Sequence, residues 1–176
     1  MRYDALFEAL GKTIDARSVV VGMGNTLRSD DGIGGRIAEA LAGRVPCRVF
    51  SAGVTPENFL GKIAHEHPRN VFFVDAVDFG ATPAEAHLFD RSALESKNFF
   101  LTHNASISLL FDAVRARTSA ACFLIAVQPK RVAFGEHLSR ELEEFLRSFC
   151  QRFPLLFNQG HEHQNVLFDS GKNTEH

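Results

Sequence analysis

The 176-residue sequence contains no tryptophan, one tyrosine and three cysteines, whereas phenylalanine occurs 17 times. The cysteines, Cys47, Cys122 and Cys150, are odd in number, show no C-x-x-C spacing and lie among apolar neighbours. This pattern favours buried free thiols over a disulfide framework or a zinc site. The aromatic part of the core is therefore expected to consist of phenylalanine.

A strong charge imbalance and long apolar runs are also missing. Nineteen basic residues against 21 acidic residues leave a formal net charge of −2, which indicates no broad attraction to nucleic acid or to an acidic membrane. No apolar run approaches the length of about 20 residues that spans a bilayer. The first 17 residues carry acids and no unbroken apolar stretch, unlike a secretory signal. We expect a cytoplasmic protein of one domain, without membrane insertion.

Common catalytic signatures are absent as well. The sequence has no G-x-S-x-G nucleophile elbow and no H-E-x-x-H zinc motif. No cysteine lies beside a histidine in an electropositive turn. The His-Glu-His triplet at 65–67 lies at the end of an expected helix, before Pro68, which favours solvated or capping side chains.

The most informative segment is 18–34, which reads SVVVGMGNTLRSDDGIG. Branched apolar residues followed by Gly-x-Gly predict a buried strand over 19–23 that ends in a tight turn, where α/β proteins gather ligand sites. A dinucleotide fingerprint is disfavoured because Leu27 stands in place of its third glycine and two acids would repel phosphate. One of Asp30 and Asp31 is expected to cap the following helix. The other is a candidate metal ligand or catalytic acid.

The remainder of the chain alternates between strand and helix patterns. Such alternation predicts an α/β three-layer sandwich, with a mainly parallel twisted sheet of about five strands and helices on both faces. We expect an N-terminal extension with a short helix at 1–17, a domain at 18–153 and a flexible tail at 154–176. The expected strands are 19–23, 47–50, 70–74, 86–89 at an edge, and 122–127. The expected helices are 4–12, 33–41, 56–65, 92–95, 104–117 and 139–153.

Three polar residues fall at strand ends or loops that a parallel sheet places along one edge. Asp31 follows the first strand, Asp75 ends the third, and His103 is expected in a loop before a helix. Two carboxylates and an imidazole suit a borderline cation such as Ni²⁺ or Zn²⁺, and three ligands leave open positions. Alternatively, Asp75 binds backbone N–H groups at its strand end, and His103 with Asn104 forms an ordinary helix entry.

Five motifs in these regions resemble those of the hydrogenase maturation endopeptidases, in family order and spacing. The second to fifth motifs are most similar to those of the family branch that processes the hydrogenase of formate hydrogenlyase. The motifs are VGMGNTLRSDDGIG at 21–34, AGVTPEN at 52–58, FFVDAVDFG at 72–80, LTHNASI at 101–107 and AVQP at 126–129.

The resemblance implies an endopeptidase that removes the C-terminal extension of a nickel–iron hydrogenase large-subunit precursor after nickel insertion. It places the ligands of the substrate-borne nickel on Asp31, Asp75 and His103, a site that zinc or cadmium would also fit. The remaining motif residues are expected to bind substrate: Gly24, Asn25, Asp30, Gly32, Gly53 and Asn104. A non-catalytic metal-binding assembly factor or chaperone for hydrogenase maturation is the alternative function.

Two further features bear on substrate binding and packing. Many relatives have Asp-Gly-Gly where this chain has Ser51, Ala52 and Gly53, so any contribution of that acid to substrate binding in relatives has no equivalent here. Phe99 and Phe100 are expected in the core, with an exposed docking surface as the alternative.

Overall fold

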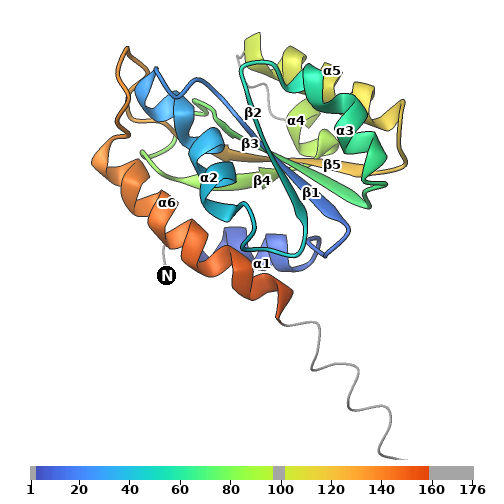
Figure 1. Cartoon of the computed structure of the whole chain (residues 1–176). Coiled ribbons are helices and arrows are strands. Elements are labelled where there is room, and N and C mark those ends of the chain that lie inside the picture. Colours follow the sequence, from blue (N-terminus) through green and yellow to red (C-terminus); the bar gives the residue numbers. More distant parts are fainter. Residues whose placement is uncertain (1–2, 97–101, 159–176) are drawn as a thin grey trace, which may run out of the picture.

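A five-stranded sheet with the order β2-β1-β3-β5-β4 forms the centre of the molecule (Figure 1). The computed structural model describes residues 3–96 and 102–158. Four strands are parallel, and β4 pairs antiparallel with β5 at an edge. This confirms the predicted α/β class. The strands are β1 (Ser18–Met23), β2 (Arg48–Gly53), β3 (Asn70–Ala76), β4 (Ala86–Phe89) and β5 (Ala121–Val127).

Alternation along the strands divides the core between the two faces of the sheet. Val20 and Phe72 belong to one buried cluster, whereas Val19, Val21 and Phe73 belong to the other. Successive side chains of a strand point to opposite faces, so strands buried on both faces must be apolar at nearly every position. The wholly buried β1 and the nearly wholly buried β3 meet this requirement.

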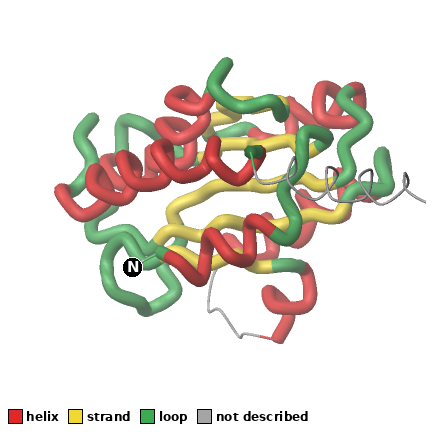
Figure 2. Tube along the Cα trace, turned by 90° about the horizontal axis from the view of Figure 1, so that it is seen from below, coloured by secondary structure: helices red, strands yellow, loops and turns green. Residues whose placement is uncertain are grey.

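Helices cover both faces of the sheet. Apolar residues of α1, α2 and α6 join one cluster, and those of α3, α4 and α5 join the other. Figure 2 shows α1 and α6 crossing the same side of the strands. None of the described helices is long and apolar enough to cross a bilayer. The α-helices are α1 (Asp4–Gly11), α2 (Ile33–Leu41), α3 (Leu60–His65), α4 (Arg91–Ser96), α5 (Thr102–Arg115) and α6 (Arg140–Arg152), and the 3₁₀ turns are η1 (Ser29–Gly32), η2 (Pro56–Phe59) and η3 (Phe153–Phe157).

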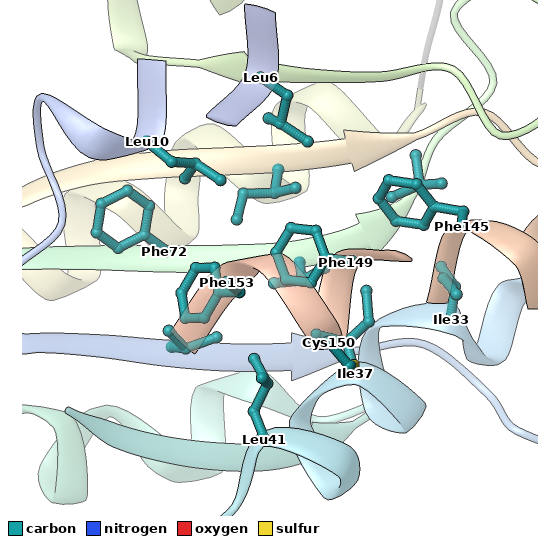
Figure 3. Close-up of a cluster of buried hydrophobic side chains, with 14 of the residues drawn as sticks. Leu6, Leu10, Ile33, Ile37, Leu41, Phe72, Phe145, Phe149, Cys150 and Phe153 are labelled. Carbon is teal, nitrogen blue, oxygen red and sulfur yellow. The ribbon is translucent and has the colours of Figure 1, made fainter. Parts of the chain in front are cut away.

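The buried aromatic side chains of the larger cluster are all phenylalanine, which confirms the prediction from composition. Phe72, Phe145, Phe149 and Phe153 are fully buried there, and the rings of Phe149 and Phe153 stack with centroids 5.1 Å apart (Figure 3). The three cysteines are buried free thiols, which confirms that prediction. Burial raises the pKa of Cys47 and of Cys122 to about 12, so both stay protonated and unreactive at neutral pH.

Several predicted boundaries differ from the structure. The second strand extends to Gly53 instead of ending at residue 50, because its last residues pair with β1 across a bulge between Gly22 and Met23. The helix at 4–12 is predicted to belong to an N-terminal extension that precedes the domain. Leu6, Phe7 and Leu10 are buried in the cluster that also contains residues of α6. Figure 3 shows Leu6 and Leu10 in this cluster.

Helix α5 begins at Thr102, so His103 lies in its first turn and the prediction of a preceding loop is wrong. Ser139 and Thr55 are the N-cap residues of α6 and η2, but neither side chain forms a capping hydrogen bond. The expectations for Phe99, Phe100 and most of the tail fall on residues outside the described ranges.

Candidate functional site

Two glycines allow α2 to pack directly on the sheet. A Cβ atom on Gly34 would lie 2.1 Å from the carbonyl oxygen of Val74 and 2.4 Å from that of Met23. A Cβ atom on Gly22 would lie 2.1 Å from the carbonyl oxygen of Gly34. Contacts this short exclude any side chain. The first turn of α2 therefore rests on the carboxyl ends of β1 and β3, which brings the acids of η1 next to the end of β3.

The turn between β1 and η1 fixes Asp31. Its Oδ2 atom accepts a hydrogen bond from the backbone N–H of Asn25 at 2.9 Å. The side chain of Asn25 in turn accepts the N–H of Leu27 at 2.9 Å. Gly24 has a φ of +106°, and a Cβ atom there would lie 1.8 Å from the carbonyl oxygen of Asp31. Only glycine satisfies both conditions at this position.

Asp75 is a buried carboxylic acid at the end of β3. Its side chain is 8% exposed, and its Oδ1 atom accepts the N–H of Ala76 at 3.0 Å. Burial and, to a lesser extent, the negative charge of Asp31 raise the pKa of Asp75 to about 7, although the hydrogen bond from Ala76 acts in the opposite direction. A carboxyl group whose pKa lies near 7, beside a second carboxylate, is a common arrangement at functional sites.

Asp31 and Asp75 line the same cavity, which has a volume of about 570 Å³. Most of its wall is apolar, and Val54 and Leu109 are exposed at its surface. Glu57 adds a third, exposed carboxylate. The lining comprises Met23, Gly24, Asp31, Gly53, Val54, Pro56, Glu57, Leu60, Asp75, Ser106, Ile107, Leu109, Leu110 and Ala113.

The third predicted ligand lies on a neighbouring helix. His103 and Asn104 belong to the first turn of α5, and the next residues of that helix, Ser106 and Ile107, line the cavity. The side chains of His103 and Asn104 lie outside what the structure describes. Among the described residues, no group of three His, Cys, Asp or Glu side chains is placed to hold a metal ion.

Asp30 has a different environment from its neighbour Asp31. Its side chain is fully buried, and its Oδ2 atom accepts the N–H groups of Lys130 and Arg131, each at 2.9 Å. Its Oδ1 atom accepts the N–H of Ser139 at 2.6 Å. Asp30 thus joins η1 to the loop before α6. The prediction that one of the two acids caps α2 is wrong, because the N-cap residue is Gly32 and no side chain caps that helix.

The glycines of the motifs lie close to the cavity. Gly53 lines it with a φ of +57°, and its carbonyl oxygen accepts the N–H of Gly24 at 3.0 Å. A Cβ atom on Gly32 would lie 2.8 Å from the Cα atom of Thr26. These positions keep the backbone of the two loops close together beside Asp31.

The role of Gln128 was not predicted from the sequence. This buried side chain accepts the N–H groups of Phe79 and Ala81 at 2.9 and 3.1 Å and donates to Oδ1 of Asp78 at 3.0 Å. It thereby shapes the loop that follows Asp75. The available signal was a polar residue at the end of an apolar strand, at the same sheet edge as the acids.

Comparisons with known proteins find the same kind of relative by sequence and by structure. The family profile described as "HycI: Hydrogenase maturation protease" matches residues 34–153. The hydrogenase 3 maturation protease of Escherichia coli K12 is 29% identical over 136 residues, covering 76% of this chain and 86% of that protein. The crystal structure of the [NiFe] hydrogenase maturation protease HycI from Thermococcus kodakarensis superposes with a TM-score of 0.77 at 27% identity, covering 85% of this chain and 99% of that one.

Proposed function

This chain belongs to the hydrogenase maturation protease family and is therefore a peptidase, and we propose that it recognises nickel already bound in its substrate. The substrate is the precursor of a nickel–iron hydrogenase large subunit, and the cut removes its C-terminal extension. The nickel ligands supplied by this chain are Asp31, Asp75 and His103. The ion arrives with the precursor and is part of the substrate.

The observation that carries the proposal is the shared cavity of Asp31 and Asp75. The two carboxylates come from different elements, and their mutual repulsion together with burial disfavours two negative charges in the absence of a cation. A bound divalent cation reverses this preference. An incomplete ligand set that is completed only by the metal of the precursor binds the metallated form more tightly, which gives specificity by a difference in affinity.

The apolar wall beside the acids suits a peptide chain. Residues that flank the scissile bond would lie along Val54, Leu60 and Leu110, with the bond itself close to the carboxylates. Gly24 and Gly53 leave room for close approach of a second backbone. A metal ion near the scissile bond supplies polarisation of its carbonyl or activation of a water molecule.

The decisive experiment compares nickel-loaded and nickel-free precursor. We expect cleavage of the loaded form only, followed as a mass loss equal to the C-terminal extension. Mass analysis also distinguishes cleavage from binding without cleavage, as an assembly chaperone would show. Equal cleavage of both forms, or of neither, contradicts the proposal.

The variant His103→Ala tests the third ligand. We expect it to abolish cleavage of the loaded precursor while the melting temperature stays within a few degrees of the wild-type value, because a residue in the first turn of a helix contributes little to the core. A large loss of melting temperature would instead assign His103 a structural role.

A further inference from the structure

Three large apolar side chains are exposed on two loops near the acids. Leu27 is 50% exposed, Val132 is 43% exposed and Phe134 is 92% exposed. Leu27 precedes η1, and the other two lie in the loop between β5 and α6, which runs beside the start of α2 (Figure 1). We call these three residues the apolar knob.

The two loops are joined by a short ladder of hydrogen bonds. The N–H of Ser29 donates to the carbonyl oxygen of Gly135 at 2.7 Å, and the N–H of Gly135 donates to that of Leu27 at 2.9 Å. The hydroxyl of Ser29 donates to the carbonyl oxygen of Ala133 at 3.0 Å. The knob is therefore carried by one connected piece of backbone.

A buried charge holds this piece of backbone in place. The carboxylate of Asp30 binds the N–H groups of Lys130, Arg131 and Ser139, at the two ends of the loop that bears Phe134. Charge-assisted bonds to backbone N–H groups are about twice as strong as neutral ones. Exposure of Phe134 is thus a property of a well-anchored loop, and an apolar side chain fixed in solvent is typical of an interaction site.

Positive charge predominates around the knob, because Arg28 adjoins Leu27 and Arg131 adjoins Val132, whereas Glu136 is the one acid in the loop between β5 and α6. Arg28 and Arg131 are exposed, and neither forms an ion pair with any residue in the described ranges. An apolar centre with a basic rim complements a protein surface that has an apolar patch bordered by acids.

We propose that the apolar knob docks the folded part of the precursor, on a surface beside its metal site that is apolar with an acidic rim. This inference rests on the proposed function and adds a second contact, outside the peptide cavity. Leu27 is four residues from Asp31, and Asp30 links the knob to the same turn. A folded precursor that presents its metal to Asp31 must therefore cover the knob, whereas a second copy of this chain seated there would obstruct the site.

The test compares Phe134→Ser with the matched control Leu155→Ser. Leu155 is 56% exposed and lies in η3, at the opposite end of α6 (Figure 1). Both variants remove an exposed apolar side chain, so both should melt as the wild type does. With intact nickel-loaded precursor we expect Phe134→Ser to lower kcat/KM about tenfold through KM, as loss of one anchoring aromatic does at interfaces. Leu155→Ser should stay within twofold of the wild type.

A second variant tests the basic rim. For the wild type we expect kcat/KM to decrease with rising salt, because charges at an interface rim act mainly on the association rate. The double substitution Arg28→Glu with Arg131→Glu should lower kcat/KM and abolish this salt dependence. Sedimentation of each variant tests the competing occupant. A dimeric wild type that Phe134→Ser converts to a monomer with unchanged kcat/KM overturns the proposal.

The wild type and the two serine variants also distinguish failure of the docking proposal from failure of the proposed function. If the wild type leaves the loaded precursor uncut, the proposed function fails, and binding of the precursor then still tests the knob. Weaker binding by Phe134→Ser alone supports docking. Equal binding or equal cleavage by wild type, Phe134→Ser and Leu155→Ser overturns it.

Discussion

At the scale of single residues, two adjacent aspartates perform different tasks. The carboxylate of Asp30 accepts three backbone N–H groups and is fully buried, whereas that of Asp31 accepts one and lines the cavity. The difference depends on a loop about 100 residues further along the chain. The sequence Asp-Asp alone therefore marks the region but does not assign the two roles.

Amide substitutions should separate these roles. In Asp30→Asn the single amide oxygen cannot accept all three N–H groups, so we expect a loss of about 3 kcal/mol in the free energy of unfolding. In Asp31→Asn one oxygen can still accept the N–H of Asn25, so the loss should stay below about 1 kcal/mol while cleavage is abolished. Urea unfolding and the precursor assay measure the two effects. Equal destabilisation by both substitutions would contradict this assignment.

The buried carboxyl of Asp75 predicts a pH dependence of stability. Its pKa is about 7 in the folded state, against the ordinary value of 3.8. The raised pKa favours the folded state below about pH 4, and this contribution is lost as the pH rises through 7. Asp75→Asn cannot ionise. Between pH 5 and pH 8 the metal-free wild type should therefore lose about 2.5 kcal/mol of unfolding free energy relative to Asp75→Asn.

Urea unfolding of both proteins in the presence of a chelator measures this difference. A difference that stays constant over this range would show that Asp75 does not titrate there. A difference of the opposite sign would show that the folded state stabilises the ionised carboxylate.

At the scale of elements, hydrophobic periodicity predicted most helices and strands but not their ends. The almost wholly apolar NVFFV run at 70–74 indicated a central strand, which is β3, and the spacing of Ile33, Ile37 and Leu41 indicated α2. Ends depend on partners distant in sequence. The N–H of Ser139 is bound by Asp30, and the last residues of β2 pair with β1 across a bulge. Neither partner is visible from local sequence.

Helix α5 forms one wall of the cavity, and a substitution on it should block the peptide without disturbing the acids. Ala113 lines the cavity, whereas Ala116, directly after the end of α5, is exposed and is not part of that lining. We expect Ala113→Phe to reduce kcat/KM for the precursor at least tenfold, because the added ring occupies the space that the peptide requires. Ala116→Phe is the matched control and should retain wild-type activity. The kinetics of the two variants, with melting temperatures as a check on folding, test this prediction.

At the scale of the whole molecule, the acidic residues of the candidate site lie together at the carboxyl edge of the sheet. Parallel β1 and β3 end side by side, so Asp31 and Asp75 meet although 43 residues separate them along the chain. This convergence could be predicted from the order of elements. The cavity wall and the knob could not be predicted in this way, because they depend on how loops and helices distant in the sequence pack against one another.

The first helix was predicted from the sequence to belong to an extension outside the domain. In the structure Leu6, Phe7 and Leu10 are buried, and the ring of Phe7 packs 5.5 Å from that of Phe149 on α6, between ring centroids. Arg152 adds an ion pair with Asp4 at 2.9 Å. Removal of residues 1–12 would expose this part of the core to water, and each large buried side chain contributes about 2–5 kcal/mol.

We therefore expect the shortened chain to lose most of its stability, since small domains are stable by only about 5–15 kcal/mol in total. Leu10→Ala is the milder test and should cost about 3 kcal/mol. Glu8→Ala, on the exposed face of the same helix, is its control and should change the unfolding free energy by less than about 0.5 kcal/mol. If the shortened chain has the melting temperature of the wild type, α1 is an extension outside the domain, as predicted from the sequence. Loss of cooperative unfolding would instead make it part of the domain that positions Asp31 and Asp75.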